Sequence, residues 1–159
     1  MKIDLLVVGK IKEKYFTDAI NEYVKRLSRY VRLEIIEVKD EKTSEGVSIR
    51  EEEIVMEREG ERLERYLSDS AYLVALCIEG KQKTSVEFAE SITELENRGV
   101  SHIQFIIGGS LGIAGYIKKR ADLMLSFSEM TFPHQLMRVI LLEQIYRAYR
   151  IKNNEPYHK

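Results

Sequence analysis

The sequence predicts an α/β fold in which a mostly parallel sheet carries helices on both faces. Short apolar, β-branched runs alternate with segments of helical periodicity, which is the pattern of successive βαβ units. Several of the runs are apolar at nearly every position, as in strands covered on both sides. The chain has 159 residues without a linker or internal repeat, so we expect one domain spanning residues 1–159.

Five apolar runs predict the strands of this sheet. In chain order they are residues 3–8, 33–38, 71–78, 102–107 and 123–126. These lengths are typical of strands and short for helices. Ligands on parallel sheets bind beyond the carboxyl ends of the strands, so the segments that follow the later strands are the first places to look for a site.

Segments of helical periodicity connect the strands. They span residues 13–30, 49–66, 84–97, 113–120 and 133–151. The first has one apolar stripe, whereas the second is highly charged with few apolar positions. Thr84 or Ser85 can cap the third helix, with Glu87 placed for a capping box and Gly99 as its stop. Pro133 suits the first turn of the last helix.

Composition argues against several classes of protein. Hydrophobic residues make up 44% of the chain and charged residues 32%, and no apolar run approaches the ~20 residues of a membrane span. The N-terminal residues lack a signal-peptide pattern, and the single cysteine, Cys77, lies in an apolar run. We therefore expect a soluble, cytoplasmic protein with a buried thiol. The three histidines lack metal-ligand spacing and no serine-triad motif occurs, so neither a metalloenzyme nor a hydrolase is expected.

The net charge of −1 hides an uneven distribution. From residue 100 onward eight Lys/Arg face four Asp/Glu, whereas acidic residues are in excess before it. Residues 10–32 are basic and residues 34–64 are acidic. This asymmetry permits a basic face for nucleic acid, although separately solvated helices would give the same counts.

Three segments at the predicted carboxyl edge are candidate ligand loops: residues 79–83, 108–112 and 127–132. The three glycines of Gly108–Gly112 allow the backbone to approach a ligand closely. This loop is neither a GxGxxG fingerprint nor a P-loop, which disfavours dinucleotides and nucleoside triphosphates, and a tight strand-to-helix turn would also explain it. Residues 127–132 interleave hydroxyls, aromatics and a methionine, so they could bind an adenine edge and cover its ring. A core-packed crossover is the alternative.

The last helix and the chain end supply candidate polar groups. His134 and Arg138 are four residues apart and share a helix face, although His134 could simply cap the helix. The helix is apolar around much of its circumference, which indicates a second contact with a partner subunit. The end Tyr157–Lys159 could stack a base and hold its phosphates, or be a frayed terminus.

Six stretches are distinctive when they are taken together. They are LLVVGKIKEK at 5–14, ALCIEGK at 75–81, FIIGGSLG at 105–112, LSFSEMTFPHQLMR at 125–138, EQIYRAYR at 143–150 and PYHK at 156–159. In this order and at this chain length, the sequence resembles the SPOUT-class RNA methyltransferases, specifically the ribosomal large-subunit methyltransferase H family. The likeness extends from end to end and includes no additional domain.

This resemblance implies a C-terminal trefoil knot, a rare exception among protein folds. It also implies S-adenosylmethionine as the cofactor and an active site at a homodimer interface that receives the C-terminal tail. The implied substrate is N3 of a pseudouridine in large-subunit (23S) ribosomal RNA, within assembled ribosomes. The implied adenosine pocket consists of Leu76, Gly108, Phe127, Ser128, Glu129, Met130, Thr131 and Phe132.

Roles for the polar groups follow from the implied chemistry. The N3 of the base carries a proton, so we expect His158 to act as the base that removes it. Tyr157 and Arg138 are expected to orient the reactants and stabilise negative charge. The candidate RNA contacts are His134, Arg147 and Lys159, with Lys10, Lys12 and Lys14 as further phosphate contacts.

Two other functions remain open at this point. A non-catalytic ribosome- or RNA-binding protein could keep the same fold, and a SPOUT methyltransferase acting on tRNA could use the same cofactor loops. Because the chain has no additional recognition domain, we expect a ribosome-directed enzyme to select its substrate by the shape of the ribosome.

Overall fold

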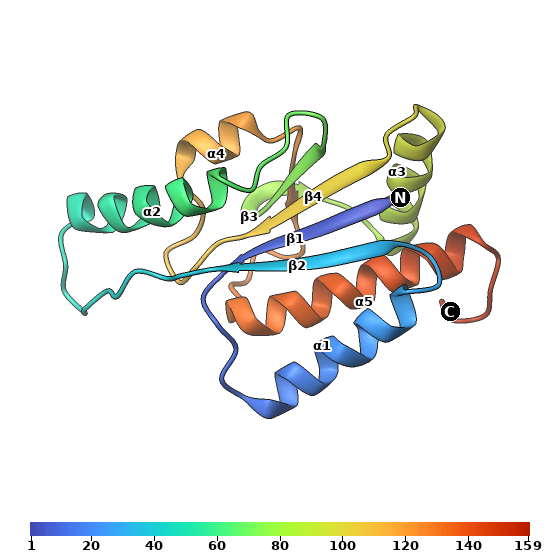
Figure 1. The fold of residues 1–159 in the computed structure, drawn as a ribbon, viewed down its shortest axis with the longest axis horizontal. Helices are drawn as coiled ribbons and strands as arrows, with labels where there is room; N and C mark the ends of the chain where they lie inside the picture. Colours follow the sequence, from blue (N-terminus) through green and yellow to red (C-terminus); the bar gives the residue numbers. More distant parts are fainter.

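Five parallel strands form the central sheet in a computed structural model that describes residues 1–159 (Figure 1). The strands are β1 (Lys2–Val8), β2 (Arg32–Val38), β3 (Tyr72–Gln82), β4 (His102–Ile107) and β5 (Leu123–Ser126). Their order across the sheet is β2-β1-β4-β3-β5, and every ladder is parallel. The predicted fold class is confirmed, while the trefoil knot stays a prediction.

Helices cover both faces of the sheet. They are α1 (Lys14–Leu27), α2 (Ile49–Glu64), α3 (Ser85–Asn97), α4 (Gly115–Arg120) and α5 (His134–Lys152). One apolar core joins α1, α3 and α5 to the sheet, and a smaller one joins α2 and α4 to its other face. In Figure 1, α1 and α5 lie below the sheet, and α2 and α4 lie above it.

The side chains of β1 point in turn into the two apolar cores, which explains why its sequence is apolar at nearly every position. Ile3, Leu5 and Val7 belong to the larger core, whereas Leu6 and Val8 belong to the smaller one. All five are almost fully buried, since successive side chains of a strand point to opposite faces. A central strand of this kind has no solvent face and therefore no polar alternation.

Element boundaries agree with the sequence to within three residues, except at the end of β3. Thr84, and not Ser85, is the N-cap of α3, with the predicted capping box to Glu87. Pro133 is the N-cap of α5 and stands just outside the first turn. The predicted loop 79–83 is wrong over most of its length, because β3 continues through Gln82 and pairs again with β5 after a register shift.

Gly80 is the residue that permits this continuation. A Cβ at this position would lie 2.7 Å from the backbone carbonyl carbons of Met124 and Leu125. Real Cβ atoms do not approach backbone so closely, so the end of β3 can pack against β5 in this way only with glycine there. The sequence pattern identified the strand but contained no sign of this close approach.

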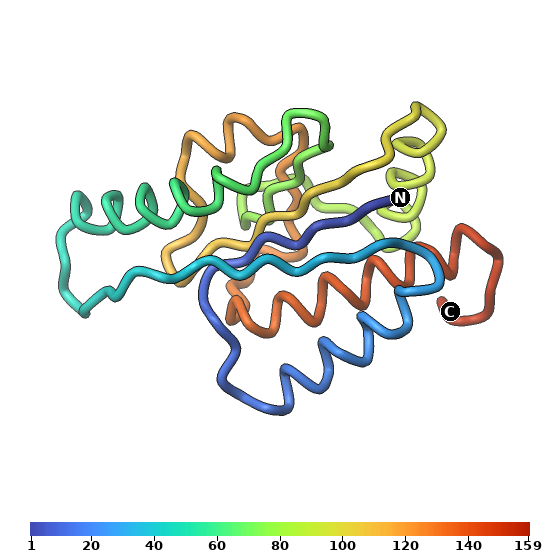
Figure 2. Tube along the Cα trace, viewed as in Figure 1, coloured from blue at the N-terminus to red at the C-terminus, as the bar shows by residue number.

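The trace in Figure 2 shows two segments that leave the body of the sheet. Helix α2 and the turn before it project from one end, and the chain after α5 turns back at the other. None of the helices combines the length and apolar character needed to cross a membrane. No group of three or more His, Cys, Asp or Glu side chains is arranged to hold a metal ion.

A buried polar cluster replaces apolar packing near the start of β1. The Asp4 carboxylate is 2% exposed and lies 2.7 Å from His102 Nε2 and 3.3 Å from Lys2 Nζ. Gln104 Nε2 donates to the same carboxylate at 3.0 Å and to the Tyr66 carbonyl at 2.9 Å. Burial raises the pKa of Asp4, but the hydrogen bonds from Gln104 and His102 outweigh it and leave the pKa lowered.

Asp4 is therefore expected to stabilise the fold above about pH 4 and to lose this contribution in acid. Because its pKa is lower in the folded than in the unfolded chain, the stabilisation is complete above the unfolded value of about 4 and disappears as the pH falls through the folded value. Asp4→Asn should lower the free energy of unfolding at pH 7 by about 1.5–3 kcal/mol. Urea titrations at fixed protein concentration should show a smaller loss at pH 3 than at pH 7, and an equal loss would contradict this role.

Candidate functional site

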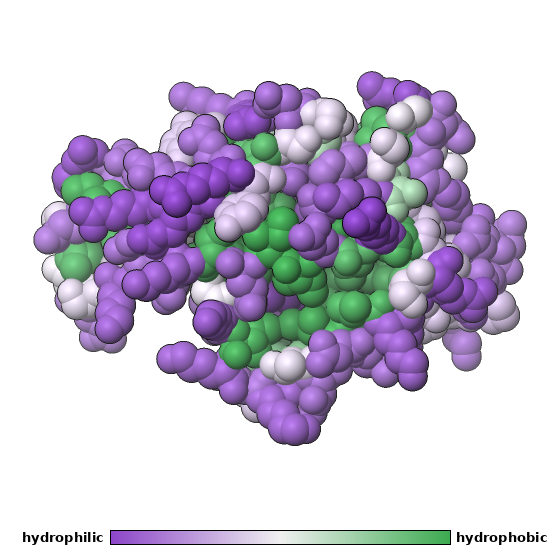
Figure 3. All heavy atoms as spheres, in the orientation of Figure 1, coloured by the Kyte–Doolittle hydropathy of each residue, from purple (hydrophilic) through white to green (hydrophobic).

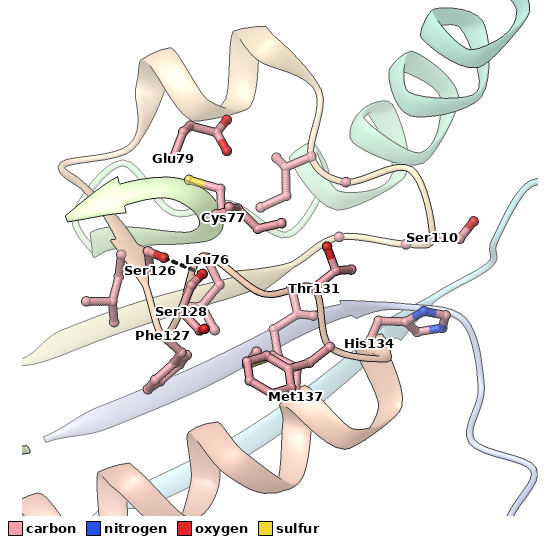
Figure 4. Close-up of a pocket in the computed structure, with 18 of the residues that line it drawn as sticks. Leu76, Cys77, Glu79, Ser110, Ser126, Phe127, Ser128, Thr131, His134 and Met137 are labelled. Atoms are coloured by element: carbon pink, nitrogen blue, oxygen red, sulfur yellow. Dashed lines mark hydrogen bonds between the residues drawn. The ribbon is translucent and has the colours of Figure 1, made fainter. Parts of the chain in front are cut away.

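A cavity of about 640 Å³ opens at the carboxyl ends of β3, β4 and β5. Its walls are the end of β3, the loop after β4, the loop after β5 and the first turn of α5 (Figure 4). This volume is within the usual range for small-molecule sites, and the position is the one expected for a parallel sheet. The lining is mostly apolar side chains, hydroxyls and glycine backbone.

Seven of the eight residues predicted to bind the cofactor line this cavity: Leu76, Gly108, Phe127, Ser128, Met130, Thr131 and Phe132. Glu129 belongs to the same loop but is exposed and does not line the cavity. The structure thus brings together segments that are some fifty residues apart in the sequence. The binding roles themselves stay predictions.

The Gly108–Gly112 loop forms a wall of backbone. A Cβ at Gly108 would lie 2.6 Å from the Gly112 carbonyl carbon and 2.7 Å from its oxygen. Gly112 has φ +94°, and its N–H donates to the Gly109 carbonyl at 3.0 Å. The loop is a tight turn, as the simpler reading of its sequence expected, and it is also a cavity wall that no larger residue could form.

Residues 126–132 are held in shape by their own hydroxyl groups. Ser126 Oγ donates to the Ser128 carbonyl at 3.0 Å, and Met130 N–H donates to Ser128 Oγ at 3.0 Å. Phe127 packs against the larger core, whereas Met130 is 74% exposed at the cavity. The segment therefore combines the core packing and the ligand-facing geometry that the sequence left as alternatives.

The cavity contains one ion pair. Lys118 Nζ on α4 lies 2.5 Å from Glu79 Oε1 on β3. This contact lowers the pKa of Glu79. Cys77 lines the same wall, where burial and the charge of Glu79 raise the pKa of its thiol. The expectation that this thiol belongs to the core was wrong, since it is only partly buried and borders the cavity.

His134 lies at the opposite end of the cavity from Glu79 (Figure 4). It is the first residue of α5, and no side chain caps this helix. Burial lowers the pKa of His134, and the nearby Arg138 acts in the same direction, while Asp40 opposes them. The imidazole is therefore neutral at physiological pH and faces the cavity without a capping role.

Arg138 is buried, and both terminal nitrogens of its guanidinium donate hydrogen bonds within the fold, whereas its Nε has no partner. It is 1% exposed, and its guanidinium donates to Glu37 Oε2 at 2.9 Å and to the Val8 and Gly9 carbonyls at 2.9 and 2.7 Å. Burial lowers its pKa and the ion pair with Glu37 opposes this shift. Its contacts with Glu37, Val8 and Gly9 tie α5 to the ends of β1 and β2. Arg138 does not line the cavity. The catalytic role proposed for it stays a prediction.

Arg138→Leu is expected to destabilise the protein by about 3 kcal/mol. The substitution leaves the buried carbonyls of Val8 and Gly9 without their donor, and it also removes the ion pair with the more exposed Glu37. Arg138→Lys should recover only part of the lost stability, because a single ammonium group cannot donate in the directions of the two guanidinium nitrogens. Chemical denaturation measures both effects. Full stability of Arg138→Leu combined with lost activity would instead favour the catalytic role.

The C-terminal tail is folded against α5. Tyr157 Oη donates to Glu143 Oε1 at 3.0 Å, and Arg147 Nη2 donates to the same oxygen at 2.5 Å. Arg147 Nη1 donates to His158 Nδ1 at 3.1 Å. Burial and the Glu143 carboxylate raise the pKa of Tyr157, so its phenol stays protonated. The hydrogen bonds of Tyr157 and His158 with α5 thus order the tail, which is not a frayed end.

The tail and the cavity of one chain lie far apart. His158 contacts Arg147, which is thirteen residues along α5 from His134, or about 20 Å at the helical rise. The predicted catalytic set is therefore not assembled within one chain. The other candidate RNA contacts, Lys10, Lys12, Lys14 and Lys159, are all exposed, and Lys14 pairs with Asp18 at 2.8 Å.

Among the lining residues, Met137 and Lys118 were not predicted from the sequence, and neither was the pairing of Lys118 with Glu79. Met137 could have been found, because it is three residues after His134 and shares its helix face. The pairing of Glu79 with Lys118 depends on how α4 lies over β3, which no local pattern reports.

The fold and the cavity match a known family of enzymes. A family model described as Predicted SPOUT methyltransferase matches residues 1–158. The chain therefore belongs to the SPOUT methyltransferase family.

Curated relatives are similar over the whole chain. The chain is 61% identical to ribosomal RNA large subunit methyltransferase H of Bifidobacterium adolescentis, over 159 residues and 100% of both chains. The identity is 57% to the protein of the same name from Bifidobacterium animalis subsp. lactis and 55% to that from Clostridium kluyveri, again over 100% of each chain.

Proposed function

We propose that this chain is a cytoplasmic, homodimeric enzyme of one domain that transfers a methyl group from S-adenosylmethionine to N3 of a pseudouridine in large-subunit ribosomal RNA, within assembled ribosomes. The observation that carries the proposal is the cavity walled by Gly108–Gly112 and residues 126–132 in a SPOUT methyltransferase. The names of the full-length relatives support ribosomal RNA over tRNA as the substrate, and an enzyme over a binding protein.

The residues present fit this methyl donor. Adenosine needs apolar walls with backbone hydrogen-bonding groups, and Leu76, Phe127 and the Gly108 backbone line the cavity. The donor has no phosphate, and the cavity has no phosphate-binding loop. When bound, the donor supplies an electrophilic methyl group on a positively charged sulfur. The protein positions this group and excludes water from it.

A second copy of the chain supplies the tail in this proposal. One subunit's His158 cannot reach its own cavity across the length of α5. Figure 3 shows hydrophobic side chains gathered over β2 and the α1–α5 layer on one face. Leu33 and Ile35 of β2, which pack against the core shared with α1 and α5, are only partly buried. An apolar face on the α1–α5 side supports pairing of two copies and a tail that enters the partner's site.

His158 removes the N3 proton of the base in this proposal, while Tyr157 and Arg147 hold the tail and the RNA. Because Arg147 donates to Nδ1, the single proton of a neutral His158 ring is on Nε2. The lone pair that accepts the substrate proton is therefore occupied in the docked tail. When RNA binds, His158 must therefore leave Arg147 and contact the nucleobase.

Calorimetric titration tests the donor assignment directly. S-adenosylmethionine and S-adenosylhomocysteine should bind saturably, whereas ATP and NAD should not, because the cavity has no phosphate-binding loop. Absence of binding by either sulfur compound would favour the alternative of a non-catalytic RNA-binding protein.

A further inference from the structure

A buried carboxylate lies behind the wall of the cavity. Glu59 of α2 is only 4% exposed. Its Oε2 accepts the backbone N–H of Glu41 at 3.1 Å, while Oε1 is buried without a hydrogen-bond partner. Burial raises the pKa of this carboxyl, the N–H of Glu41 opposes the shift and the charge of Asp40 adds to it. A half-satisfied acid in a core calls for an explanation.

The unpartnered oxygen faces the Gly108–Gly112 loop. A Cβ at Gly109 would lie 2.9 Å from Glu59 Oε1, 3.1 Å from Oε2 and 3.2 Å from Val8 Cγ1. Gly109 lines the cavity, so its backbone separates the carboxylate from the space for the ligand. The loop is therefore in contact with Glu59 on one side and with the ligand space on the other.

Close packing of α2 fixes where this carboxylate sits. A Cβ at Gly60, the next residue, would lie 2.7 Å from Tyr116 Oη and 3.1 Å from Ala114 Cβ. These two residues belong to α4 and its N-cap, directly after the glycine loop. Helix α2 thus holds the segments at both ends of the loop, through Glu59 at Gly109 and through Gly60 at α4.

An apolar residue would fill the position of Glu59 without leaving an oxygen unpartnered. Leu63, one turn further along α2, is buried in this way. The carboxylate instead joins two segments, because one oxygen holds the chain at Glu41 and the other contacts Gly109. This double contact points to control of the loop and not to core packing alone.

We propose that Glu59 is a positioning residue of the methyl-donor cavity, whose carboxylate supports Gly109 from behind and fixes the Gly108–Gly112 loop for donor binding. The inference rests on the proposed function and adds a residue outside the lining to it. Glu59 touches neither donor nor RNA. It acts through the loop and connects the projecting segment of residues 39–64 to the donor site.

A double-mutant cycle tests this coupling. The dissociation constant of S-adenosylhomocysteine is measured by calorimetry for the wild type, Glu59→Ala, Gly109→Ala and the double variant. Each single change should weaken binding about tenfold, the first by loosening the loop and the second by the clash with the carboxylate. In the Glu59→Ala background, Gly109→Ala should cost less than about threefold, because the new methyl occupies the vacated space.

Controls separate positioning from stability. Glu61→Ala, an exposed change on the same helix, should leave the dissociation constant within about twofold of the wild type. Thermal unfolding of every variant shows whether lost binding reflects lost folding. If Glu59→Ala does not fold, Glu59→Asp replaces it in the cycle. The shorter side chain keeps the carboxyl group and leaves space for the methyl group that Gly109→Ala adds.

Three results would overturn the inference. Additive losses in the double variant would mean that Glu59 and Gly109 are independent. Wild-type affinity in folded Glu59→Ala would mean that the carboxylate does not set the loop. Failure of the wild type to bind S-adenosylhomocysteine would refute the donor proposal itself, and the role of Glu59 with it, and is distinct from the first two results.

Discussion

His158→Ala is expected to lower the rate of methyl transfer by about 10²–10⁴-fold while leaving donor affinity unchanged. The imidazole contacts Arg147 far along α5 and does not line the cavity of its own chain, and its proposed role is to take a proton from the RNA base and not to hold the donor. Its removal therefore affects the chemical step and not donor binding. Single-turnover rates on ribosomes and calorimetry with the donor measure the two quantities separately.

His158→Gln is the matched variant. Its amide oxygen can still accept from Arg147 and keep the tail docked, but it cannot take up a proton. We expect it to be as inactive as His158→Ala. Activity near that of the wild type in His158→Gln would show that the tail needs only a hydrogen-bond acceptor, and the base would then be another group.

Mixed dimers extend this prediction to the architecture of the site. A subunit with His158→Ala keeps a working donor cavity, and a subunit with a damaged cavity keeps a working tail. If the tail enters the partner's cavity, mixing the two inactive variants should restore one complete site per mixed dimer, which is about half of the activity of a wild-type dimer. No recovery on mixing would mean that tail and cavity act within one chain.

Gly108→Ala is expected to weaken donor binding by a hundredfold or more. The added Cβ would meet the Gly112 carbonyl at 2.6 Å, and backbone atoms cannot move aside as a flexible side chain can. The wall of the cavity must then open, and the ligand loses its fit. Calorimetric titration with S-adenosylhomocysteine measures the loss.

Gly115→Ala is the control for this change. It lies only seven residues away, at the start of α4, and a Cβ there meets nothing within 4 Å. It should bind the donor like the wild type. Equal affinities for the Gly108 and Gly115 variants would contradict the close packing on which the donor site depends.

Local sequence patterns predicted the fold because each element follows from its own residues. The apolar run of β1 and the Thr84–Glu87 capping box are clear at the level of a few residues, and both are present in the structure. The end of β3 was misjudged because its last residues, Glu79–Gln82, are polar or glycine. Their place in the sheet depends on β5, which lies more than forty residues later.

The candidate site was predicted less completely, for the same reason. Glycines and hydroxyls marked both loops of the cavity, and these loops do meet. The burial and hydrogen bonds of Arg138 could not be predicted, because its partners Glu37, Val8 and Gly9 are more than a hundred residues away in the sequence. Glu59 was hidden in a charged helix, where only the adjacent Gly60 could have indicated a close contact.

The central claim is methyl transfer from S-adenosylmethionine to large-subunit ribosomal RNA in the ribosome. The most direct test incubates the protein and methyl-labelled donor with ribosomes from cells that lack the gene, with free large-subunit RNA and tRNA in parallel. The account predicts label in the large-subunit RNA of assembled ribosomes, at N3 of a pseudouridine, and little in the free RNAs. Label in tRNA alone, or in no RNA at all, would contradict it.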